Sequence, residues 1–74
     1  MINALGKLFA DILQIITSRY VVSGRAIPED VLRLKDEAMS VYEKSRGENN
    51  SAVLEQYARR LGEIKEALEK EEQS

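Results

Sequence analysis

The sequence predicts an all-α fold, a small antiparallel bundle of three helices that run up, down and up. Apolar residues recur at alternating steps of three and four in three separate segments, which is the spacing of one face of an α-helix. The composition agrees, because the 74 residues include one proline and four glycines, and 32% of them are charged. This length fits a single domain, residues 1–74.

The first expected helix covers residues 3–20, with Asn3 as its N-cap. Its apolar face is broad and comprises Ile2, Leu5, Leu8, Phe9, Ile12, Leu13, Ile15 and Ile16. A face this broad usually contacts two neighbours. It is therefore either the centre of a monomer's core or a core face with a residual patch for a partner or a second copy.

The stretch after this helix is expected to be a corner between helices. Ser23 and Gly24 supply a permissive turn, and no other segment alternates with the period of a partner strand. Tyr20, Val21 and Val22 are more apolar than is usual for a solvent-exposed turn without other contacts. We expect them either to close the end of the core or to contact a partner.

The second expected helix covers residues 28–46. Pro28 suits the first helical position, where its missing N–H would be unpaired in any residue. Glu29 and Asp30 follow it, where the helix dipole favours negative charge, and Gly47 fits the C-terminal cap.

The third expected helix covers residues 52–70, with a frayed acidic tail at 69–74. Its outer face carries three ion pairs at i,i+4 spacing: Glu55–Arg59, Arg59–Glu63 and Glu66–Lys70. We expect Gly62 to mark a close approach between helices. We also expect Tyr42 and Tyr57 to face each other across the turn at 47–51.

The inventory of reactive side chains argues against an enzyme. The chain has no histidine and no cysteine, so the most common general base, thiolate nucleophile and metal ligands are missing. Its glycines are scattered rather than gathered in a phosphate-binding loop. We therefore expect no catalytic residue, cofactor or metal site.

The charges argue against nucleic acid as a partner. Eleven basic and 13 acidic residues give a net charge of −2, and the adjacent pair Arg59-Arg60 lies among glutamates. Asp11 and Gln14 interrupt the apolar N-terminal region, so neither a signal peptide nor a membrane-spanning helix is expected. The location expected is cytoplasmic. Contact with a membrane surface stays open, although only Lys7 and Arg19 could attract anionic lipid in the first helix.

Three stretches, LGKLFADILQII, EDVLRLKDEAMSVYEKSRGENN and LEQYARRLGEIKEAL, together resemble the small helical bacteriocin immunity proteins. The likeness lies in apolar spacing and helix lengths and covers most of the chain. It implies an antiparallel helical bundle that protects a producer cell from its own peptide bacteriocin. This chain is shorter, lacks room for a fourth helix, and is acidic where that family is often basic. Secretion-system co-chaperones and phage adaptors look similar, so an adaptor that binds a partner helix is the alternative.

The sequence thus predicts a non-enzymatic interaction protein that binds a protein or peptide partner. A monomer and a homodimer that completes the bundle are the two alternatives for its assembly. The residues expected to form the partner-binding surface are Leu8, Ile15, Tyr20, Val21 and Val22.

Overall fold

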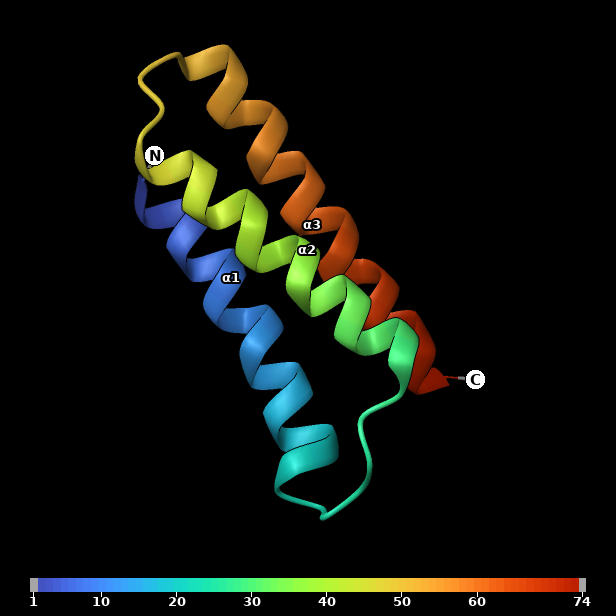
Figure 1. Ribbon diagram of the computed structural model, residues 1–74. Coiled ribbons are helices and arrows are strands. Elements are labelled where there is room, and N and C mark those ends of the chain that lie inside the picture. The colour runs from blue at the N-terminus through green and yellow to red at the C-terminus, as the bar shows by residue number, and fades with distance from the viewer. Residues whose placement is uncertain (1, 74) are drawn as a thin grey trace.

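The computed structural model describes the backbone of residues 2–73 and the side chains of residues 4–70. It contains three α-helices, α1 (Ile2–Ile16), α2 (Glu29–Arg46) and α3 (Ser51–Gln73), and a π-helical segment, η1 (Thr17–Val21), that continues α1. Figure 1 shows α2 returning antiparallel beside α1, and α3 running back in the direction of α1. The bundle measures 39 × 19 × 19 Å. The all-α, up-down-up prediction is confirmed.

The helix ends differ from the expected ones by a few residues. The first helix begins at Ile2, so Asn3 lies inside it and is not the N-cap. Pro28, with φ −61° and ψ 152°, is the N-cap of α2 rather than its first helical residue. Gly47 is the C-cap of α2, as expected.

The last helix is longer than expected. It begins at Ser51, whose neighbour Asn50 caps it by accepting a hydrogen bond from Ala52 N–H at 2.9 Å on its side-chain oxygen. It continues through Gln73, three residues beyond the expected end at residue 70, and the frayed tail expected at 69–74 stays a prediction. Residue 74 lies outside the described residues.

All three helices bury apolar side chains in one core, which also includes the π-helical segment. The buried apolar residues are Leu5, Ile12, Ile16, Tyr20, Val31, Ala38, Leu54, Leu61, Ile64 and Leu68. They keep the three-and-four spacing that the sequence shows, so each helix presents one continuous stripe to the other two.

The broad face of α1 forms the centre of this core, because α1 packs against both α2 and α3. On the α2 side, Phe9 stacks on Tyr42 with ring centroids 4.8 Å apart and planes 13° from parallel. The expected pairing of Tyr42 with Tyr57 is not among the ring contacts of the described side chains. Tyr57 instead lies half-buried against the core. The expected close approach at Gly62 is also wrong, since a Cβ there would meet nothing within 4 Å.

Two ion pairs connect helices across the bundle, and a third joins two residues of α3. Arg60 donates two hydrogen bonds to the Glu37 carboxylate of α2, one from Nε and one from Nη2, which lies 2.7 Å from Oε1. Its Nη1 lies 3.1 Å from Glu63 Oε1. Lys65 Nζ lies 3.4 Å from Asp11 Oδ2 and links α3 to α1. The three expected i,i+4 pairs are not among the ion pairs of residues 4–70.

The contact with Arg60 changes the acidity of Glu37. The bidentate hydrogen bond from the guanidinium lowers the pKa of the Glu37 carboxyl below its ordinary value, against a smaller opposing effect of desolvation. The carboxylates likewise raise the pKa of Arg60. Arg60 therefore serves to join α2 to α3.

Candidate functional site

The connection between α1 and α2 is the part of the described chain with the most distinctive backbone. Val22 N–H donates to Thr17 O at 2.9 Å, a five-residue span that widens the last turn into a π-helix. Gly24 follows with φ of +72°, in the left-handed region that favours glycine. The expected Ser-Gly turn is therefore present at this position.

Two hydrogen bonds close the corner. Gly24 N–H donates to Val21 O at 3.2 Å, and Arg25 N–H donates to Tyr20 O at 2.8 Å. With a left-handed glycine between them, these bonds form a Schellman motif, which satisfies carbonyls that the helix end leaves free. Ser23 adds a side-chain hydrogen bond from its hydroxyl to Arg19 O. The backbone of the corner is thus fixed by its own hydrogen bonds.

Side chains attach this corner to the rest of the bundle. Arg19 Nη1 donates to the carbonyl oxygen of Leu68 in α3 at 2.6 Å. The Arg25 guanidinium carbon lies 5.6 Å from the centroid of the Tyr20 ring, which is cation–π geometry. Tyr20 itself is 5% exposed and belongs to the core. Of its two expected roles, Tyr20 takes the first and closes the end of the core.

The two residues after Tyr20 point away from the core. Val21 is 60% exposed and Val22 is 76% exposed, and every residue from 21 to 26 is exposed. Among the described residues these are the most exposed large apolar side chains. Two adjacent apolar side chains on a fixed backbone form a candidate binding site, which we call the valine corner (Val21 and Val22).

The remaining residues of the expected surface lie elsewhere. Leu8 and Ile15 are half-buried on α1 and pack against the core. Sequence reasoning missed two further exposed apolar residues, Leu32 (39% exposed) and Met39 (40% exposed) on α2. The sequence signal that could have indicated their exposure is that both lie at the margin of the apolar stripe of α2.

A shallow groove of about 340 Å³ lies between α1 and α3. Its lining is mostly polar and consists of Asp11, Gln14, Ile15, Ser18, Lys65 and Glu69. The ion pair between Asp11 and Lys65 crosses it.

Within the described part of the chain, no group of three or more acidic side chains is placed to hold a metal ion. The described helices also include none that is long and apolar enough to cross a membrane. Comparisons with protein-family models, with curated proteins and with solved structures find no match for this chain.

Proposed function

We propose that this chain is a non-enzymatic, cytoplasmic protein-binding bundle that presents the valine corner to a protein or peptide partner. The observation that carries this proposal is the exposure of Val21 and Val22, at 60% and 76%, on a backbone held by the Schellman motif. Burial of a valine side chain contributes about 1.5 kcal/mol or more, so two of them supply a useful share of a binding energy.

The form of the corner favours binding in a second way. A partner that docks on a fixed backbone does not have to order it, and the entropy cost of association falls accordingly. Ser23, Gly24 and Ala26 beside the valines are small and exposed, so a partner can approach the backbone closely. The valine corner is therefore a pre-organised apolar contact.

Site-specific photo-crosslinking tests this function. A photo-reactive amino acid in place of Val22, in cells that encode this chain, should give one discrete protein or peptide adduct. The same amino acid in place of Gln56, an exposed residue of α3, should not give it. Adding Val21→Glu should remove the adduct, because the partner would have to bury an unpaired charge. Equal labelling from both positions, or no adduct at either, would refute the proposal.

Protection against a peptide bacteriocin is one specific form of this function. It is supported by the resemblance of the helix pattern to bacteriocin immunity proteins. Expression of the chain in cells sensitive to a panel of peptide bacteriocins should protect them from at least one. The double variant Val21→Glu/Val22→Glu should lose protection, while Gln56→Glu keeps it. If no peptide in the panel is resisted and a partner is still crosslinked, the chain acts as an adaptor for a partner helix.

A further inference from the structure

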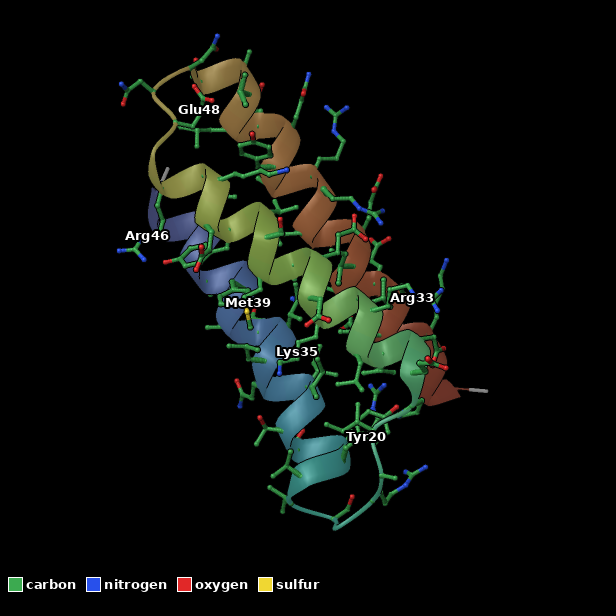
Figure 2. All side chains as sticks on the ribbon, in the orientation of Figure 1. Tyr20, Arg33, Lys35, Met39, Arg46 and Glu48 are labelled. Atoms are coloured by element: carbon green, nitrogen blue, oxygen red, sulfur yellow. The ribbon has the colours of Figure 1, made fainter. Side chains whose placement is uncertain are left out.

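A second surface runs along one edge of α2, the one nearest α1. Five residues at spacings of three or four share this edge, which we call the α2 edge: Leu32, Lys35, Met39, Glu43 and Arg46. Figure 2 shows Lys35, Met39 and Arg46 along the same side of α2. Leu32 and Met39, at 39% and 40% exposed, are the apolar residues of the edge. This spacing places the five side chains on one face of the helix.

The charged residues of this edge have no ion-pair partner of their own among the described side chains. The ion pairs that α2 makes with α3 use Glu37, on the opposite side of the helix. On the α2 edge, Lys35 lies four residues before Met39 and Glu43 lies four residues after it. A positive and a negative charge are thus placed symmetrically about an exposed apolar residue.

We propose that the α2 edge is a homodimer interface, in which a second copy of this chain packs its own α2 edge antiparallel around a twofold axis at Met39. This register places Met39 against Met39 of the second copy. It brings Lys35 opposite Glu43 of the second copy, and the symmetry repeats that pair on the other side. Leu32 falls opposite the aliphatic part of Arg46, which covers apolar surface while its charge stays in water.

The charge order identifies the occupant as a second copy. An isologous interface needs a patch that is complementary to itself, so that residue i contacts residue j and j contacts i. An edge with charges of one sign would repel its own copy. An edge with the order positive, apolar, negative is complementary to a copy of itself that runs in the opposite direction. This surface is distinct from the valine corner, and either proposal can fail without the other.

The length of the α2 edge limits how tightly two copies can bind. An α-helix of 18 residues is about 27 Å long, and a single helix pair of that length is at the small end of stable interfaces. The dimer should therefore depend on concentration. Sedimentation equilibrium from micromolar to millimolar chain should show a mass rising from 8.4 kDa toward twice that value.

Charge reversal tests the register. Lys35→Glu alone and Glu43→Lys alone each set like charges opposite one another twice, and each should weaken dimerisation about tenfold. The double variant Lys35→Glu/Glu43→Lys restores both pairs and should dimerise nearly as well as the native chain. Lys44→Glu and Glu55→Lys are the matched controls, since they change the same charges at exposed positions outside the α2 edge. Circular dichroism confirms that each variant stays helical.

Single cysteines test the position of the axis, because the native chain has none. Met39→Cys should form a disulfide-linked dimer rapidly in mild oxidant, and Gln56→Cys should not. A chain that stays at the monomer mass at millimolar concentration overturns the proposal. So does a double charge variant that remains as weak as the single ones, or a Gln56→Cys chain that crosslinks as fast as Met39→Cys.

Discussion

The substitution Gly24→Ala isolates the free-energy cost of the left-handed residue in the corner. Gly24 has φ of +72°, and a Cβ added there would meet nothing within 4 Å. Steric contact with neighbours therefore contributes nothing, and only the backbone conformation is penalised. An alanine in the left-handed region destabilises the folded state by about 1–2 kcal/mol. It also lowers the conformational entropy of the unfolded chain, which stabilises the fold by about 0.4–1 kcal/mol. We expect a net loss of about 1 kcal/mol in the free energy of unfolding.

The same chemical change in α3 should have the opposite sign. Gly62 lies in the helix interior, and a Cβ there also meets nothing within 4 Å. Gly62→Ala should therefore raise the free energy of unfolding by about 1 kcal/mol through helix propensity alone. Gly24→Asn should lose less than Gly24→Ala, because asparagine tolerates the left-handed region better.

Urea denaturation followed by circular dichroism measures these effects. The midpoint should fall for Gly24→Ala and rise for Gly62→Ala, with the slope unchanged in both. If Gly24→Ala is as stable as the native chain, the corner does not hold a left-handed residue, and the Schellman motif is wrong. If both variants shift in the same direction, alanine is acting through the unfolded chain rather than through the local conformation.

Two further substitutions test the core and the ion pair between α2 and α3. Ile12→Ala, at a fully buried site, should lower the free energy of unfolding measured in urea by about 2–5 kcal/mol. Leu32→Ala should lower it far less, and equal losses would contradict the assignment of Ile12 to the core and Leu32 to the surface. Because Arg60 lowers the pKa of Glu37, their contact stabilises the fold above the ordinary glutamate pKa, and this stabilisation is lost as the pH falls through the lowered value. Both side chains are more than a third exposed, so Glu37→Gln should cost less than about 1 kcal/mol at neutral pH and nothing in strong acid. A constant difference across the pH range would exclude this assignment.

Local patterns gave the helices and the corner correctly. The three-and-four spacing of apolar residues predicts each core stripe, because burial must follow the helical period. Ser23 and Gly24 predict the turn, because few residues other than glycine readily adopt a positive φ. The cap of α2 was off by one position, since proline fits both the N-cap and the first turn.

The contacts between helices were not predictable in the same way. The expected ion pairs of α3 followed from i,i+4 spacing, but the structure pairs Arg60 with Glu37, a residue 23 positions away. The exposure of Leu32 and Met39 likewise depends on how α2 is rotated about its own axis against α1. Spacing along one helix does not specify that rotation, because several rotations bury nearly the same stripe.

The sequence by itself determined the all-α class, the three helices and the turn at Gly24, because these follow from local periodicity and backbone sterics. Only the tertiary structure decided that Tyr20 closes the core while Val21 and Val22 remain exposed. Tyr20 lies four residues after the buried Ile16 and extends the same stripe through the π-helical segment, whereas Val21 and Val22 fall off that stripe. Three neighbouring apolar residues, alike in sequence, thereby divide between the core and the surface.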